Sequence, residues 1–230
     1  MSRDRDYVLG THDDEIARLA LQHRVWRPRA LDAWRRAGFT VGQTLLDIGC
    51  GPGHASLDLA EIVGPSGRIV AMDRSRRFLD ALEATRLQRG LDNITTLELD
   101  LDAAGPPPVA ADGAWARWVF AFVKHPRDLL ARVGGALRRG GVLVVHEYFD
   151  YATWRVAPRS PEIEEFVRVV MESWRADGGG AGHRPRPADL AGRAWLRDEE
   201  PPPDHRCRPG LKFRVAVADA VYSGGSSPAG

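Results

Sequence analysis

The sequence has no apolar run close to the roughly 20 residues that a membrane-spanning helix requires. Residues 1–7 are charged and lack the apolar core of a secretory signal peptide. Only two cysteines occur, Cys50 and Cys207, which is too few for a disulfide framework. Cysteine, histidine and acidic residues nowhere show metal-ligand spacing, so we expect no metal site. These absences predict a cytoplasmic protein that does not enter a membrane.

A strong charge of either sign is also missing. The 32 basic and 31 acidic residues give a formal net charge of +1, which offers no reason to expect nucleic acid or a membrane surface as a partner. A chain of 230 residues with 43% hydrophobic and 27% charged residues can build one substantial core. Lysine is rare, with only Lys124 and Lys212 present. The accompanying richness in arginine, alanine, glycine and proline is typical of a GC-rich coding sequence.

Three glycines follow a short apolar run at residues 44–48, which reads as a buried strand. After Gly53, apolar residues recur at helical spacing, so the glycines lie on a strand-to-helix turn. Glycine suits such a turn because it accepts positive φ and lets the backbone approach a ligand. The first N–H groups of the helix would face whatever is bound. The pattern therefore predicts a small-molecule site.

The glycine spacing identifies the class of ligand. A dinucleotide turn requires G-x-G-x-x-G, whereas this chain has G-x-G-x-G, with His54 where the third glycine would fall. With Asp47 two residues before the first glycine, the stretch resembles the first motif of class I S-adenosylmethionine-dependent methyltransferases. The resemblance implies S-adenosyl-L-methionine as cofactor. A nicotinamide-dependent oxidoreductase of similar fold is the less favoured alternative.

Acidic residues end the next two predicted strands. The second strand covers residues 68–72 and ends in Asp73, and the third covers residues 93–99 and is followed by Asp100. The resemblance implies that Asp73 binds the cofactor ribose and that Asp100, or alternatively Asp102, faces the adenine amino group. Asp73 could instead cap the following helix, over residues 76–89, as could Ser75. The expected cofactor-binding residues are Asp47, Gly49, Cys50, Gly51, Gly53, Asp73, Arg74, Asp100, Leu101 and Arg117.

Two helices are expected before the first strand. Thr11 and Asp14 have capping-box spacing, and one face then carries Ile16, Leu19, His23 and Trp26. Pro28 can open a second helix that ends near Gly38. In the methyltransferases that the chain resembles, such a segment covers the cofactor, although a helix pair that only packs on the sheet fits equally well.

The remaining pattern alternates between strands and helices. The fourth strand is expected at residues 114–120, a helix at 127–139 ended by Gly140 and Gly141, a fifth strand at 142–146 and a further helix from Ser160 with an apolar stripe. The stripe consists of Ile163, Phe166, Val167, Val170 and Trp174. Alternation of this kind predicts an α/β fold with a doubly wound, mostly parallel sheet, the Rossmann-like methyltransferase fold.

We expect a helical cap at residues 1–40, a cofactor-binding core at 41–176 and an irregular tail at 177–230. Between residues 176 and 210 the only large apolar side chains are Leu190, Trp195 and Leu196, too few for the last helix and strand pair that the resemblance implies. A frameshift near residues 178–182 would explain this composition, because a one-base shift of a GC-rich back-translation restores a helix-and-strand pattern. A naturally divergent tail is the alternative. Residues 212–221 could still add one strand.

The resemblance implies methyl transfer to a small molecule, as in quinone and natural-product methyltransferases. Candidate acid–base residues are His125, His146 and Glu147, with Tyr148 beside them, although a structural role suits each of them better. The chain lacks an Asn-Pro-Pro-Tyr-like tetrapeptide after the fourth strand, which argues against methylation of adenine in DNA. A cofactor-binding relative without catalytic activity is the alternative. The acceptor atom and the oligomeric state stay open.

Overall fold

The computed structural model describes residues 13–147, together with 159–162, 164–165, 168–169, 172 and the strand at 212–217. Among these residues, no helix is long and apolar enough to cross a membrane.

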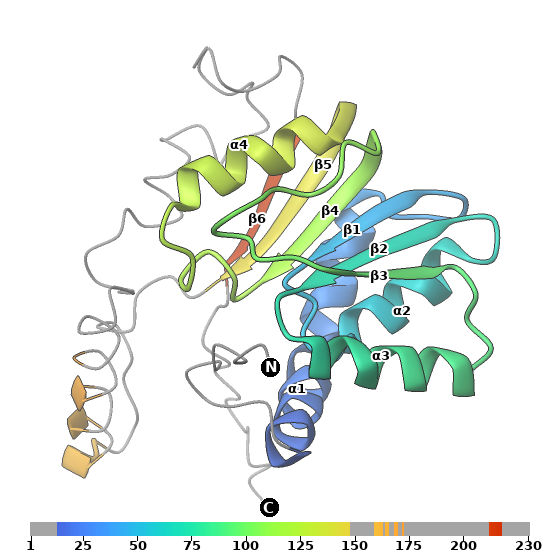
Figure 1. Cartoon of the computed structure of the whole chain (residues 1–230). Helices are drawn as coiled ribbons and strands as arrows, with labels where there is room; N and C mark the ends of the chain where they lie inside the picture. The colour runs from blue at the N-terminus through green and yellow to red at the C-terminus, as the bar shows by residue number, and fades with distance from the viewer. Residues whose placement is uncertain are drawn as a thin grey trace, which may run out of the picture.

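A six-stranded parallel sheet forms the centre of the fold (Figure 1). Its strands lie in the order β3-β2-β1-β4-β5-β6. The bounds are Thr44–Ile48 for β1, Arg68–Asp73 for β2, Ile94–Glu98 for β3, Ala111–Arg117 for β4, Leu137–Glu147 for β5 and Lys212–Val217 for β6. The strand order reverses between β1 and β4, and open α/β sheets bind ligands outside the carboxyl ends of the strands at such a point. The doubly wound fold is confirmed.

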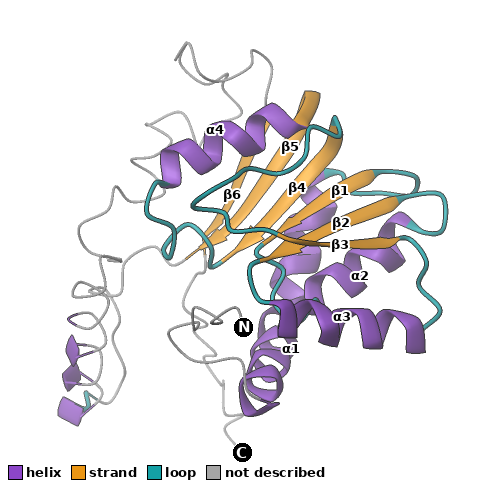
Figure 2. Cartoon of the chain, in the orientation of Figure 1, coloured by secondary structure: helices purple, strands orange, loops and turns teal. Residues whose placement is uncertain are grey.

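Helices cover both faces of the sheet (Figure 2). Helices α1 (Asp13–Ala37), α2 (His54–Val63) and α3 (Arg76–Gln88) pack in one hydrophobic cluster with side chains such as Leu45, Ile69 and Val144. Helix α4 (Pro126–Ala136) packs in the other cluster, against Leu46, Val70 and their neighbours. The two clusters take alternate residues of the same strands, as the period-two geometry of a strand requires.

The expectation of two N-terminal helices is wrong. A single helix, α1, runs from Asp13 to Ala37 and contains Pro28 in its interior. Proline removes one backbone hydrogen bond there, but the helix continues because residues on both sides of it are held by tertiary contacts. On the carboxyl side, Trp34 is fully buried with its ring edge-on to Trp115, at a centroid distance of 5.2 Å.

Three further boundaries differ from the sequence prediction. Strand β4 ends at Arg117 rather than at residue 120, because Trp118 has φ of 54° and turns the chain out of the sheet. Helix α4 ends at Ala136, and β5 already begins at Leu137. The register of β4 and β5 shifts between Ala111 and Gly113, which accommodates residues 138–141 within the strand instead of in a turn.

The C-terminal part of the chain contributes a strand to the sheet. Strand β6 pairs in parallel with β5, with Lys212 opposite Val142, so the strand expected within residues 212–221 is present. Among the described residues it has no antiparallel neighbour. Described residues between 161 and 172 are helical, as expected, but the apolar stripe predicted for that helix and most of the predicted tail lie outside the described residues.

Candidate functional site

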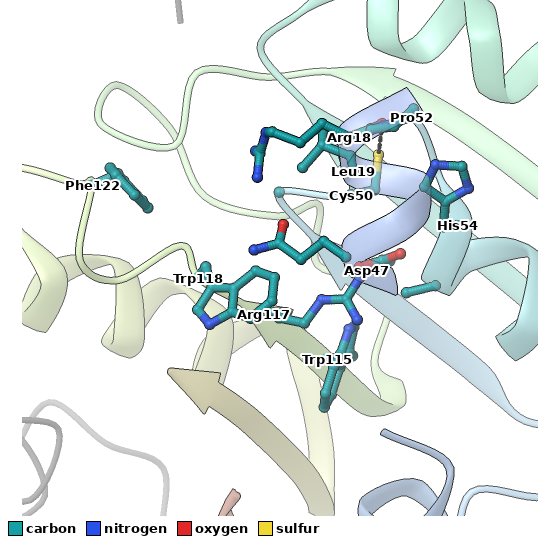
Figure 3. Close-up of a pocket in the computed structure, with 14 residues that line it drawn as sticks. Arg18, Leu19, Asp47, Cys50, Pro52, His54, Trp115, Arg117, Trp118 and Phe122 are labelled. Carbon is teal, nitrogen blue, oxygen red and sulfur yellow. Dashed lines mark hydrogen bonds between the residues drawn. The ribbon is translucent and has the colours of Figure 1, made fainter. Parts of the chain in front are cut away.

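A pocket lies at the carboxyl ends of β1 and β4, where the strand order reverses (Figure 3). Its walls come from α1, the glycine turn, the start of α2 and the segment after β4. The lining residues are Arg18, Leu19, Gln22, Asp47, Gly49, Cys50, Gly51, Pro52, His54, Ala55, Trp115, Arg117, Trp118 and Phe122. Five of the predicted cofactor-binding residues are therefore brought together here, namely Asp47, Gly49, Cys50, Gly51 and Arg117.

The three motif glycines all have positive φ but have different surroundings. A Cβ on Gly49 would lie 2.6 Å from Val119, and one on Gly53 would lie 2.3 Å from Leu82. A Cβ on Gly51 would meet nothing within 4 Å. Gly49 and Gly53 are thus required by packing, whereas Gly51 leaves open space beside the pocket that a ligand can fill.

Asp47 supplies a buried carboxylate at the bottom of the pocket. Its Oδ2 accepts a hydrogen bond of 2.5 Å from the Ser56 hydroxyl on α2. Burial raises the pKa of Asp47 to about 6, while the hydrogen bond from Ser56 and the positive charge of Arg117 oppose that rise. At neutral pH the carboxylate is therefore largely ionised and negative. Figure 3 shows Arg117 reaching into the same pocket from β4.

Asp73 ends β2, as predicted, and is 2% exposed. Its Oδ2 accepts from the backbone N–H of Gly51 at 2.9 Å, and its Oδ1 accepts from the N–H of Ser75 at 2.9 Å. Burial raises the pKa of Asp73, and these two donors oppose that rise. The cap of α3 is Ser75, whose hydroxyl accepts from Phe78 N. Asp73 instead ties the glycine turn to the end of β2.

The other predicted cofactor residues lie along neighbouring strand ends without lining the pocket. Asp100 is exposed after β3 and accepts a hydrogen bond of 2.9 Å from the N–H of Asp102 through its Oδ1. Leu101 is buried in the cluster that contains α4, and Arg74 is exposed. A ligand that reached both the pocket and these residues would have to extend along the carboxyl edge from β1 to β3.

None of the three acid–base candidates lines the pocket. His125 is exposed at the start of α4, and Glu147 is buried with its Oε2 accepting from Phe120 N at 3.0 Å. His146 is 2% exposed and packs against the rings of Trp26, Trp115 and Trp118, with centroid distances of 5.2, 5.8 and 5.6 Å. Burial, and to a lesser degree the charge of Arg117, lowers the pKa of His146 to about 4.

Sequence reasoning did not identify the residues that close the pocket from the other side. Arg18, Leu19 and Gln22 come from α1, His54 from the first position of α2, and Trp118 and Phe122 from the segment after β4. The periodicity of α1 did place Leu19 on the same face as His23 and Trp26. The resemblance implied that this segment covers the cofactor, but nothing local indicates which residues in the amino-terminal half of α1 form a pocket wall.

Comparison with known proteins agrees with this geometry. The family model described as a methyltransferase domain matches residues 46–143. This range contains the end of β1, the glycine turn, β2 to β4, α2 to α4 and the start of β5. This part of the chain therefore carries the sequence pattern of a methyltransferase domain. Of the predicted cofactor-binding residues within this range, Asp47, Gly49, Cys50, Gly51 and Arg117 line the pocket.

Individual relatives match parts of the chain. Demethylmenaquinone methyltransferase of Lactococcus lactis is 35% identical over 77 residues, which is 34% of this chain and 29% of the relative. Aklanonic acid methyltransferase DauC of a Streptomyces species is 27% identical over 143 residues, 60% of this chain and 64% of the relative. The chain thus spans less than two thirds of either relative. The YcgJ protein of Bacillus subtilis has the same fold, with a TM-score of 0.50 and 16% identity over 65% of this chain and 59% of its own.

Proposed function

We propose that the pocket binds S-adenosylmethionine and that the protein transfers the cofactor's methyl group to a small molecule. The observation that carries the proposal is the open space at Gly51, beside a buried carboxylate and a guanidinium at the strand-order reversal. An amino-acid group carries one negative and one positive charge, and Arg117 and Asp47 offer the matching partners. The described residues therefore fit the cofactor.

The proposed binding mode extends along the carboxyl edge of the sheet. The amino-acid end would lie at the glycine turn, the ribose at Asp73 and the adenine near Asp100 and Leu101. Each carboxylate oxygen of Asp73 already accepts one backbone N–H, but a carboxylate oxygen can accept two hydrogen bonds. Ribose hydroxyls can therefore bind there without displacing the bonds that hold the glycine turn. Gly53 would contribute by letting Leu82 of α3 pack against the glycine turn.

The cofactor would supply a methyl group on a sulfonium, which leaves as a neutral thioether after in-line attack by the acceptor. The protein's contribution is alignment and exclusion of water, and holding two reactants together can supply about 7–11 kcal/mol. Trp118 and Phe122 give the pocket an aromatic wall, which suits an apolar or aromatic acceptor. Two relatives are methyltransferases named for demethylmenaquinone and aklanonic acid, which supports a small-molecule acceptor.

The domain division follows from the same proposal. Residues 1–40 would act as a helical cap, 41–176 as the cofactor-binding core and 177–230 as the tail. The part of the cap that the structure describes supports this assignment, because Arg18, Leu19 and Gln22 of α1 line the pocket. The proposal includes a cytoplasmic location and excludes nucleic acid and a membrane as partners. It leaves the oligomeric state open.

Calorimetric titration with S-adenosylhomocysteine tests the binding step. We expect one site per chain in the wild type and a much weaker interaction in Arg117→Met, with no saturable binding of NADH to either protein. Saturable binding of NADH without binding of S-adenosylhomocysteine would contradict the proposal. Turnover is tested separately by following transfer of a labelled methyl group to a panel of quinones, phenols and amines. Cofactor binding without transfer to any acceptor would favour the non-catalytic relative.

A further inference from the structure

His23 and Asp58 form a buried pair outside the predicted cofactor motif. His23 lies on α1 and is 6% exposed, and Asp58 lies on α2 and is 8% exposed. The Nε2 atom of His23 lies 3.1 Å from Oδ2 of Asp58, which also accepts a hydrogen bond of 2.7 Å from Nε of Arg27. Buried polar groups of this kind need satisfied partners, so the pair fixes α1 against α2.

The other ring nitrogen of His23 faces the pocket residue Arg117. Nη2 of Arg117 lies 3.1 Å from Nδ1 of His23, although 94 residues separate the two in the chain. A guanidinium can only donate hydrogen bonds, so Nδ1 must be the acceptor. An ionised carboxylate can only accept, so Nε2 must carry the proton that it shares with Asp58. Asp58 and Arg117 therefore both favour the imidazole tautomer that carries its proton on Nε2 and none on Nδ1.

Asp58 is suited to keep the proton of His23 on Nε2. Burial acts to raise the pKa of Asp58, but the hydrogen bonds from His23 and Arg27 outweigh burial and keep the pKa below its ordinary value. The carboxylate is thus ionised and holds the proton of His23 on Nε2. The guanidinium of Arg117 is confined further by the Trp118 ring, whose centroid lies 5.1 Å from its Cζ.

We propose that His23, oriented by Asp58, is a positioning residue that holds the Arg117 guanidinium toward the part of the pocket where the cofactor carboxylate binds. An arginine side chain has several rotatable bonds, and fixing it before the ligand arrives lowers the entropy lost on binding. The proposal rests on the proposed function, because it assigns a role to residues around the same site. It also makes the placement of α1 a condition for cofactor recognition.

Two substitutions test separately the contact of Nδ1 with Arg117 and the contact of Nε2 with Asp58. In His23→Asn, the amide oxygen can take the place of Nδ1 and accept from Arg117, whereas the side chain is too short to reach Asp58. In His23→Gln, the longer amide reaches toward Asp58 and leaves Arg117 without its acceptor. We expect His23→Gln to weaken S-adenosylhomocysteine binding about tenfold and His23→Asn to weaken it about threefold or less, as one charged hydrogen bond would.

A second ligand distinguishes positioning from a general loss of structure. 5′-Methylthioadenosine has the nucleoside but no amino-acid carboxylate, so we expect its affinity to change by less than about twofold in both variants. In an Arg117→Met background, His23→Gln should cause no further loss of S-adenosylhomocysteine affinity, because the group that it positions is gone. Equal losses in the two His23 variants, or equal losses for the two ligands, would overturn the proposal.

A spectroscopic measurement on the intact protein covers the case in which a variant fails to fold. With nitrogen-15 labelled histidine, the ring of His23 should show a protonated Nε2 and a bare Nδ1 at pH 7.5. A proton on Nδ1 would contradict the proposal directly. Failure of the wild type to bind S-adenosylhomocysteine at all would instead reject the proposed function, so the two failures are distinguishable.

Discussion

Gly51 and Gly53 share a positive φ but differ in what surrounds their Cα atoms, and this difference predicts opposite phenotypes. A methyl group at Gly51 would enter open space beside the pocket, so Gly51→Ala should stay folded and bind S-adenosylhomocysteine at least about tenfold more weakly, with about 1 kcal/mol of backbone strain. A methyl group at Gly53 would overlap the Leu82 side chain at 2.3 Å, so the main effect of Gly53→Ala should be a lower free energy of unfolding rather than a lower cofactor affinity. Thermal unfolding and calorimetry on the two proteins check the pair. Normal cofactor affinity in a folded Gly51→Ala would place the site elsewhere.

His146 predicts how stability depends on pH. Its folded pKa of about 4 lies below the ordinary value of 6.5 because burial disfavours the imidazolium. Between pH 4 and pH 6.5 the imidazole binds a proton in the unfolded chain but not in the folded protein. The contribution of the neutral His146 to the free energy of unfolding is therefore complete above pH 6.5 and is lost as the pH falls toward 4. In His146→Phe this dependence is removed, and the aromatic packing with Trp26, Trp115 and Trp118 is kept.

The measurement is urea unfolding of both proteins at pH 7 and pH 4. The wild type should lose about 2–3 kcal/mol more than His146→Phe over this range, as expected from a pKa difference of this size. Equal losses would show that His146 titrates alike in the folded and unfolded protein.

At the scale of elements, helix α1 shows how tertiary contacts override a local signal. Pro28 is exposed in the interior of the helix and removes a hydrogen bond to the preceding turn. Pro28→Ala should therefore stabilise the protein by about 1–2 kcal/mol, since the restored helix outweighs the greater freedom of the unfolded chain. Pro126 is the contrasting case, because it is buried and occupies the first turn of α4, where no hydrogen bond is lost.

Chemical denaturation of the two alanine variants tests the argument. Pro126→Ala should be neutral or slightly destabilising, so the two substitutions are expected to have opposite signs. Destabilisation by Pro28→Ala would mean that a bend at Pro28 is needed to seat Trp34 against Trp115.

For the whole molecule, the sheet divides into a part that forms the site and a part that only completes the fold. All pocket residues lie on α1, β1, the glycine turn, α2, β4 and the segment after β4. Among the described strands, β6 pairs only with β5. Removing residues 212–230 should expose the outer edge of β5, whose Leu143, Val144 and Val145 are buried. An exposed apolar edge both weakens the sheet and invites aggregation.

We expect this truncation to lower Tm by at least about 2–4 °C, the change that 1 kcal/mol produces in a chain of this size. Affinity for S-adenosylhomocysteine should stay within about threefold of the wild type, a change of less than 1 kcal/mol. Light scattering and calorimetry on the truncated protein provide the readouts. A large loss of affinity with unchanged stability would show that the C-terminal part contributes to the site.

Much of the fold could be predicted because its signals are local. The apolar run, the three glycines and the acid after β2 lie within a few residues of one another, and β1 has the bounds that the sequence predicted. The end of β4 was missed because Trp118 adopts a positive φ that no local pattern indicates. The hypothesis of a shifted reading frame beyond residue 176 stays a prediction, although the strand expected at its end, β6, is present.

By itself, the sequence determined which segments become strands, where the glycine turn opens and that Asp47 and Asp73 would lie at the carboxyl ends of neighbouring strands. Steric preferences of adjacent residues are enough for this, because they set the backbone before any distant contact forms. Only the tertiary structure decided that α1 is one helix, that it closes the pocket and that His23 joins Asp58 to Arg117 across 35 and 94 residues. Burial and hydrogen-bond pairing of side chains depend on partners far away in the chain, so no local pattern encodes them.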